Sequence, residues 1–280
     1  MLDITTLTLD DVEAGVRLST QAGWNQVAAD WERFLALSPN GCFAGRIDGD
    51  VVATTCVATY DDVSWIGMVL VDEDHRRAGY GTELFQRGLD YARDANSSAI
   101  GLDATQYGAS IYHDHDFEDA GPIERWTGPL DASPDTETAA TVLTPSARDS
   151  IYELDYATVG VDRSKLLGRL LSEVGTSALG VRDDGSLRAY AILRPGREHP
   201  QLGPIVAPDP ADLPRLLDGA AGVLTDPCLV VDSFPSPETT EVLERYGLQK
   251  RRELVRMSYE TDERLLNGSA VHGAVDFAWG

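Results

Sequence analysis

A short glycine-containing loop is the feature of this sequence best suited to chemistry. Arg76-Arg77-Ala78-Gly79-Tyr80-Gly81 follows an apolar run and precedes an amphipathic stretch, so it should join a strand to the start of a helix. Glycine lets backbone N–H groups approach an anion, and a helix N-terminus adds the positive end of its dipole. These features suit the loop to hold a pyrophosphate, but the R-x-x-G-x-G pattern taken alone is more typical of an ordinary turn that starts a helix. Its spacing differs from the dinucleotide G-x-G-x-x-G pattern and from the Walker loop, which needs Gly-Lys-Ser/Thr.

The elements that position this loop follow from hydrophobic periodicity. Residues 68–71 should end a strand before the loop, and residues 79–93 should form a helix after it. The apolar face of that helix carries Leu84, Phe85, Gly88, Leu89 and Ala92. The remaining pattern predicts a helix at 25–37, a hairpin that turns at 48–50, strands at 3–9, 99–104 and 117–126, and a short helix at 109–113.

The pattern of the first half returns in the second. SALGVRDDGSLRAYAIL repeats the hairpin GCFAGRIDGDVVATTCV, and LERYGL repeats YHDHDF. Gly185 follows Gly49 by 136 positions, whereas Gly247 follows Asp116 by 131. The lost residues fall where DEDHRRAGYGTEL is replaced by PDPADLPRLL, which has no glycine. The sequence predicts a tandem duplication: a first domain at 1–130, a polar linker at 131–140, and a second domain at 141–280 that lacks the glycine loop.

The loop and its surroundings resemble the GNAT superfamily of acyl-CoA-dependent N-acyltransferases over roughly residues 2–127. The most specific similarities are the R/Q-x-x-G-x-G/A loop and the Tyr-x4-Phe pair formed by Tyr112 and Phe117. The whole chain further resembles a tandem subgroup with a degenerate second copy, through Gly23-Trp24-Asn25 and Asp162-Arg163. Two positions depart from the family pattern, since Arg77 and Asp116 stand where the family has glycine.

The resemblance implies an α/β fold with two GNAT-like domains. Each would be a mostly antiparallel mixed sheet with splayed middle strands, flanked by helices. It also implies that acetyl-CoA is the co-substrate. The strand would pair with the pantetheine arm and the loop would hold the pyrophosphate. The cofactor-binding residues implied are Met68, Val69, Leu70, Val71, Arg76, Arg77, Ala78, Gly79, Tyr80, Gly81 and Thr82.

The expected chemistry is attack of a neutral amine on a thioester in a ternary complex. A strand N–H near Val69 or Leu70 would stabilise the oxyanion, and Tyr112 would protonate the departing thiolate. Asp103, at the end of a strand, is the first candidate for the general base. Asp61, Glu73 and a water relay remain alternatives.

Trp24, Asn25, Tyr60 and Trp65 are predicted to wall the acceptor pocket, although aromatic residues at such spacings are more often core. The second domain would complete that pocket or form a subunit interface, which leaves a homodimer open. The acceptor is expected to be a small-molecule or peptide amine.

Composition limits the partners. The chain has 23 basic and 46 acidic residues, a formal charge of −23, which disfavours nucleic acid and anionic membranes. Only two of the basic residues are lysines, Lys165 and Lys250, a balance that resembles proteins adapted to molar salt. Three dispersed cysteines suggest neither a metal site nor a disulfide framework. Without a membrane span or a signal-peptide pattern, the expected location is the cytoplasm. The alternative to an enzyme is a regulatory module that binds acyl-CoA without turnover.

Overall fold

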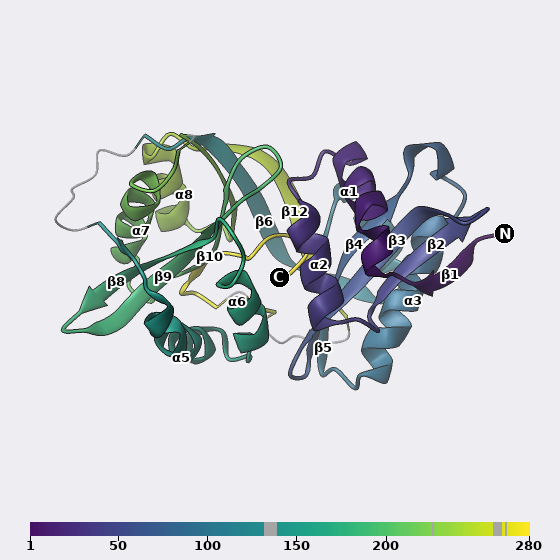
Figure 1. Ribbon diagram of the computed structural model, residues 1–280, viewed down its shortest axis with the longest axis horizontal. Coiled ribbons are helices and arrows are strands. Elements are labelled where there is room, and N and C mark those ends of the chain that lie inside the picture. Colours follow the sequence, from purple (N-terminus) through teal and green to yellow (C-terminus); the bar gives the residue numbers. More distant parts are fainter. Residues whose placement is uncertain (132–138, 226, 260–264, 267) are drawn as a thin grey trace.

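The computed structural model describes residues 1–131, 139–225, 227–259, 265–266 and 268–280. Its first half begins with a short strand and two helices, continues through three antiparallel strands, and then alternates helix and strand (Figure 1). In chain order these elements are β1 (Asp3–Thr6), α1 (Val12–Gln21), α2 (Ala28–Leu37), β2 (Cys42–Ile47), β3 (Asp50–Tyr60), β4 (Val63–Val71), α3 (Tyr80–Asp94), β5 (Ala99–Ala104), α4 (Gln106–His113) and β6 (Phe117–Pro129).

The second half repeats this order of elements and adds one short strand. Its elements are β7 (Thr141–Val142), α5 (Arg148–Val159), α6 (Ser164–Leu170), β8 (Ser177–Asp183), β9 (Ser186–Arg194), β10 (Gln201–Val206), α7 (Asp212–Ala221), β11 (Cys228–Ser233), α8 (Pro237–Arg245), β12 (Gln249–Tyr259) and β13 (Val271–Gly273). The repeated order agrees with the duplication predicted from the sequence offsets.

The two hairpins show how local sequence produces the repeat. Asp48 and Gly49 turn the β2–β3 hairpin with φ of 51° and 96°, and Asp184 and Gly185 turn β8–β9 with φ of 46° and 83°. Two successive residues with positive φ match the right-handed twist of the strands on either side, and Asp-Gly is a favoured pair for such a turn.

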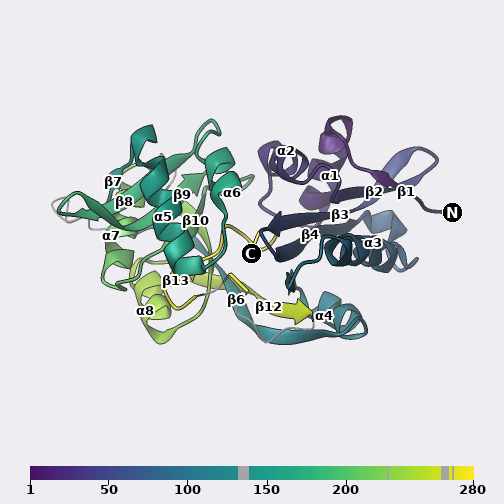
Figure 2. The same cartoon turned by 90° about the horizontal axis from the view of Figure 1, so that it is seen from below.

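The described strands form one continuous sheet, in the order β1-β2-β3-β4-β5-β12-β6-β11-β13-β10-β9-β8-β7. The sequence predicts a sheet for each half, but the two are joined because β12 of the second half lies between β5 and β6 of the first. Arg256 of β12 faces Asp103 of β5, and Leu254 faces Ile123 of β6. Figure 2 shows β6 and β12 running side by side from one half toward the other. The predicted domain boundaries stay a prediction, and residues 132–138 of the predicted linker lie outside the described residues.

Both halves contain a pair of parallel strands that separate after a short contact. β4 and β5 pair only over Val63–Trp65 and 99–101, beyond which no pairing joins them in the described chain. β10 and β11 pair at Gln201 and Val230. We call the gap beyond each contact the β4–β5 slot and the β10–β11 slot.

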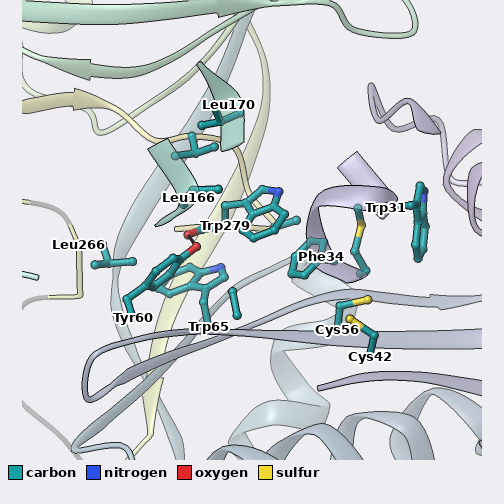
Figure 3. Packing of buried hydrophobic residues seen from close by; sticks show 14 of the residues in the cluster. Trp31, Phe34, Cys42, Cys56, Tyr60, Trp65, Leu166, Leu170, Leu266 and Trp279 are labelled. Atoms are coloured by element: carbon teal, nitrogen blue, oxygen red, sulfur yellow. Dashed lines mark hydrogen bonds between the residues drawn. The ribbon is translucent and has the colours of Figure 1, made fainter. Parts of the chain in front are cut away.

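The end of the chain forms part of the core. Trp279 is fully buried and stacks on Phe34 of α2 with ring centroids 3.7 Å apart, while its carbonyl accepts a hydrogen bond of 3.0 Å from the Tyr60 hydroxyl. Figure 3 shows Trp279 among Phe34, Tyr60, Trp65 and Leu166, which come from both halves. The apolar character of residues 271–279 predicts a packed C-terminus rather than a solvated one, and that prediction is confirmed.

Candidate active site

A cavity of about 230 Å³ opens beside the unpaired edge of β4. One end, here called the cofactor end, is lined by Val69, Val71, Gly81, Thr105, Gly108, Ile111 and Tyr112. The other, the acceptor end, is lined by Trp24, Gln26, Asp103, Arg125, Arg252, Leu254, Phe277 and Ala278. The cavity therefore combines the predicted cofactor strand and Gly81 of the loop with residues of the second half.

A bulge in β4 shapes the wall of the cavity. The register of β3 and β4 shifts between Thr54 and Cys56, opposite Met68, whose φ is 52°. Thr54 holds this distortion by donating its hydroxyl to the Met68 carbonyl at 2.8 Å. An extra residue at a bulge re-aims the backbone that follows it. Past Trp65, no β5 residue in the described chain pairs with this edge, so its backbone groups can pair with an extended ligand.

The glycine loop stands at the start of α3, as predicted. Arg77 and Gly79 have φ of 66° and 88°, and no acceptor within the described residues receives the backbone N–H groups of residues 77–82. Several N–H donors at the N-terminus of a 15-residue helix form an anion site.

Asp72, between β4 and this loop, anchors the loop to α1. It accepts hydrogen bonds from the Arg17 guanidinium and from the Asp74 backbone at 3.1 Å. Burial opposes ionisation of Asp72, but the bonds from Arg17, Asp74, His75 and Gln21 outweigh it and lower its pKa to about 2. Asp72 is therefore ionised at neutral pH and holds the loop in place.

Tyr112 lies on the face of the sheet that α3 and α4 cover. Its ring packs against Phe85 of α3, with centroids 4.7 Å apart, and an added Cβ on Gly108 would lie 3.1 Å from it. No residue of the described chain forms a hydrogen bond with its hydroxyl. Burial raises the pKa of Tyr112 to about 12, so the hydroxyl keeps its proton at neutral pH and can act as a donor.

Asp103 lines the cavity but is bound by Arg256, whose Nε and Nη2 each donate to a carboxylate oxygen at 2.9 Å. Burial raises the pKa of Asp103, against the opposing effect of Arg256. A carboxylate has about four acceptor positions, so Arg256 leaves two unused, but the Asp103 side chain is 0% exposed. The other candidate bases, Asp61 and Glu73, do not line this cavity. Asp61 accepts a hydrogen bond of 3.0 Å from the Asp162 backbone, and Glu73 is exposed.

Of the four residues predicted for the acceptor pocket, only Trp24 lines the cavity. Asn25 instead binds the second half, donating to the His199 carbonyl at 2.9 Å. Tyr60 and Trp65 lie in the core, where their polar atoms donate to the carbonyls of Trp279 and Phe277. These aromatic side chains hold the C-terminus, which in turn supplies Phe277 and Ala278 to the cavity wall.

The sequence analysis missed Gln26, Arg125, Arg252, Leu254, Phe277 and Ala278. Residues two apart in a strand share a face, so Arg252, Leu254 and Arg256 are predicted to lie on one face of β12, which would carry two arginines. Nothing local in the sequence shows that β12 borders β5, because that pairing spans about half of the chain.

Comparison with known proteins agrees with this geometry. The model of the "Acetyltransferase (GNAT) family" matches residues 12–113, and that of an "Acetyltransferase (GNAT) domain" matches residues 151–273. The chain is 25% identical over 273 residues to the uncharacterized N-acetyltransferase YitH of Bacillus subtilis, covering 95% of this chain and 94% of that relative. The holothin acyltransferase of a Pseudoalteromonas species is 23% identical over 194 residues, 69% of this chain and 65% of that relative.

Solved structures show the same fold. A putative acetyltransferase from Pyrococcus horikoshii superposes with a TM-score of 0.83 at 22% identity, over 100% of this chain and 96% of that one. A tandem GNAT protein from the clavulanic acid biosynthesis pathway superposes with a TM-score of 0.67 at 15% identity, over 95% and 100% of the two chains. The chain belongs to the GNAT acetyltransferases, as a tandem protein with two GNAT copies.

Within the part of the chain that the structure describes, no helix is long and apolar enough to cross a membrane.

Proposed function

We propose that the first copy transfers an acetyl group from acetyl-CoA to a primary amine in a ternary complex. The observation that carries this proposal is one cavity lined by β4 beyond its last pairing with β5, by Gly81 of the glycine loop and by Tyr112. Among the described residues, the backbone N–H groups of residues 77–82 and the Tyr112 hydroxyl have no hydrogen-bond partner. Each of these three features corresponds to one part of an acyl-CoA molecule.

The residues of the cofactor end have distinct roles in this proposal. The loop backbone at residues 77–82 binds the pyrophosphate, and β4 from Met68 to Val71 binds the pantetheine arm as an added strand would. An N–H of β4 at Val69 or Leu70 stabilises the oxyanion that forms when the amine attacks. Tyr112 then gives its proton to the departing thiolate.

Asp103 is the carboxylate that lines the cavity within the described residues, so we keep it as the candidate base, acting through water. Its ion pair with Arg256 leaves two acceptor positions unused, and its raised pKa strengthens it as a base, but its side chain is 0% exposed, so this role requires a shift that admits water when the amine binds. The aromatic and arginine side chains of the acceptor end would place the amine opposite β4.

The test is thiol release from acetyl-CoA with a panel of neutral, cationic and carboxylate-bearing amines. Amine-dependent release supports the proposal. If coenzyme A binds but no amine accelerates release above the rate in buffer, the alternative of a regulatory module that binds acyl-CoA without turnover replaces it.

A further inference from the structure

Two arginines face each other at the acceptor end of the cavity. Arg125 of β6 and Arg252 of β12 are directly opposite in an antiparallel register, and both line the cavity. Like charges directly opposite one another across two strands destabilise a sheet. Negative charge close to this pair of arginines would therefore stabilise the sheet.

Among the described residues, a carboxylate bonds directly to only one of the two. Asp232 accepts hydrogen bonds from Arg125 at 2.7 and 2.6 Å, and from Gln201 at 3.0 Å. Arg252 has neither a hydrogen-bond nor an ion-pair partner within the described residues, although it is partly buried. Burial and the charge of Arg125 hold the pKa of Arg252 below its ordinary value, with Asp232 opposing them. Arg252 thus lines the cavity with no ion pair to any residue that the structure describes.

A second polar group among the lining residues also has no partner in the described part of the chain. Gln26, in the loop before α2, is 4% exposed, and its buried Oε1 atom accepts no hydrogen bond from any described residue. A buried carbonyl oxygen without a donor costs about 1–3 kcal/mol, so a ligand N–H that reaches it would be bound favourably. The two groups would bind different parts of a ligand. The Gln26 carbonyl oxygen can accept a hydrogen bond from an N–H group, and the Arg252 guanidinium can donate hydrogen bonds to an anion.

We propose that the acceptor is a small amine that also carries an anionic oxygen group, most simply the carboxylate of an amino acid. This inference rests on the proposed function and adds the substrate class to it. Arg252 forms the ion pair with the anionic group, and the Gln26 carbonyl oxygen accepts a hydrogen bond from the amine; Arg125 stays paired with Asp232. The anion would supply the counter-charge that no described residue gives to Arg252. In a chain with a net charge of −23, an arginine without such an ion pair is unexpected.

The cavity contrasts with the rest of the molecule in a way that bears on the acceptor. The strongly acidic composition favours cationic acceptors at a distance, whereas Arg252, which forms no ion pair with a described residue, disfavours a cationic acceptor at the point of binding. A small volume, about 230 Å³ shared with the cofactor, also favours a compact acceptor over a folded protein surface. The charges inside the cavity should determine which acceptor binds, because salt screens buried charges less than it screens surface charges.

The experiment compares amino acids with their carboxamides as acceptors for the wild type and for Arg252→Gln. The amide keeps the amine and the size but loses the negative charge. We expect the wild type to prefer the acid, and Arg252→Gln to raise its KM for the acid roughly 10- to 100-fold, the range of a charge-assisted bond, without raising KM for the amide. Arg252→Lys should recover part of the preference, and 2-aminoethyl phosphate distinguishes a phosphate from a carboxylate requirement.

Arg251→Gln is the matched control, because it removes the same charge from the neighbouring, exposed position of β12. It should leave the preference unchanged. Equal use of acid and amide by the wild type, or equal effects of the two variants, would overturn the inference while leaving the acetyltransferase proposal intact.

A binding assay separates the two proposals if no amine is turned over. N-acetyl amino acids and their amides are the expected products, and calorimetry measures their affinity without catalysis. Tighter binding of the acids that depends on Arg252 would support the inference even if the acetyl transfer were absent. Equal or undetectable binding of both products in the presence of coenzyme A would reject it.

Discussion

The β4–β5 slot and the β10–β11 slot arise from the same arrangement of parallel strands but are filled differently. In the first half the slot opens into the cavity. In the second half, β13 enters the slot and pairs antiparallel with both strands: Gly273 lies opposite Ile205 of β10 and also opposite Ser233 of β11. An added strand is the way in which a pantetheine arm is expected to bind the first slot. The chain's own C-terminal strand takes that place in the second.

The side chains around the two slots differ accordingly. The offset of 131 that relates Asp116 to Gly247 places Leu243 in the second half where Tyr112 stands in the first. Leu243 is 1% exposed, whereas Tyr112 borders the cavity with an unpartnered hydroxyl. His272 of β13 is bonded to the Ala207 carbonyl at 3.1 Å, next to the segment that replaces the glycine loop. The second copy thus retains the frame of the fold, but its described residues have Leu243 in place of Tyr112 and no glycine in the segment 208–217.

The degenerate copy also contributes directly to the first site. After β13 the chain continues through Asp276, which pairs with Arg194, to Phe277 and Ala278 at the cavity wall. β12 brings Arg252, Leu254 and Arg256 to the same face of the sheet. The C-terminal segment from β12 onward therefore has two effects. It fills the β10–β11 slot of the second copy, and it supplies part of the cavity wall of the first.

The largest difference we expect between the slots is in cofactor binding. Coenzyme A should bind with a stoichiometry of one per chain in calorimetry, because β13 occupies the second slot and PDPADLPRLL offers no glycine loop. Gly79→Ala should weaken this binding roughly 5- to 30-fold, since alanine disfavours by about 1–2 kcal/mol the φ of 88° with which the loop presents its N–H groups to the ligand.

Gly160→Ala provides the control for Gly79→Ala. Gly160 ends α5 in the second half with φ of 79°, and an added Cβ would meet nothing within 4 Å at either glycine. The backbone strain is the same in kind, but coenzyme A affinity should not change. A stoichiometry near two would contradict the comparison, as would equal losses of affinity in both variants.

Tyr112→Phe tests the next difference, the proton donor that Leu243 cannot supply. Turnover should fall by roughly 10²–10⁴-fold, the usual contribution of a general acid, with little change in acetyl-CoA affinity. Steady-state kinetics and calorimetry together measure the two effects. Tyr107→Phe is the control, because Tyr107 lies on the same helix but is 95% exposed. A wild-type kcat in Tyr112→Phe would assign Tyr112 to packing alone.

Trp279→Ala tests how firmly the C-terminal segment is held. Replacing a buried tryptophan costs about 3–5 kcal/mol of unfolding free energy. We expect a loss near 3 kcal/mol, since the indole Nε1 of Trp279 is buried without a partner and its removal recovers part of that cost. Urea unfolding measures the change, and Tyr156→Ala, at a 58% exposed site, should shift stability by less than about 0.5 kcal/mol. A similar small shift for Trp279→Ala would mean that the segment is not part of the cooperative core.

The parts of this architecture that could be predicted from sequence are those set by neighbouring residues. The Asp-Gly hairpins, the glycine loop before α3 and the position of Tyr112 on a short helix all depend on local pattern. The acceptor end could not be predicted, because Arg125 and Arg252 meet only through the insertion of β12 into the first half. Tyr60 and Trp65 illustrate the same limit: their aromatic character predicts burial, but only the path of the C-terminus decides between core and pocket.

The smallest effects concern the two positions where the first copy departs from the family's glycines. Arg77 and Asp116 both have positive φ, 66° and 65°, and Gly247, the counterpart of Asp116, has φ of 83°. An ordinary residue in this region loses about 1–2 kcal/mol, aspartate loses less because its side chain can bond locally, and glycine costs about 0.5–1 kcal/mol in chain entropy. Arg77→Gly should therefore raise stability by about 0.5–1 kcal/mol and Asp116→Gly should change it by less than about 0.5 kcal/mol, both measured from urea midpoints. Gly247→Ala serves as the reverse control and should destabilise, because its Cβ would lie 3.0 Å from the Pro129 carbonyl oxygen. If Arg77→Gly instead destabilised the protein, the Arg77 side chain would have to make a contact that offsets the strain of its backbone.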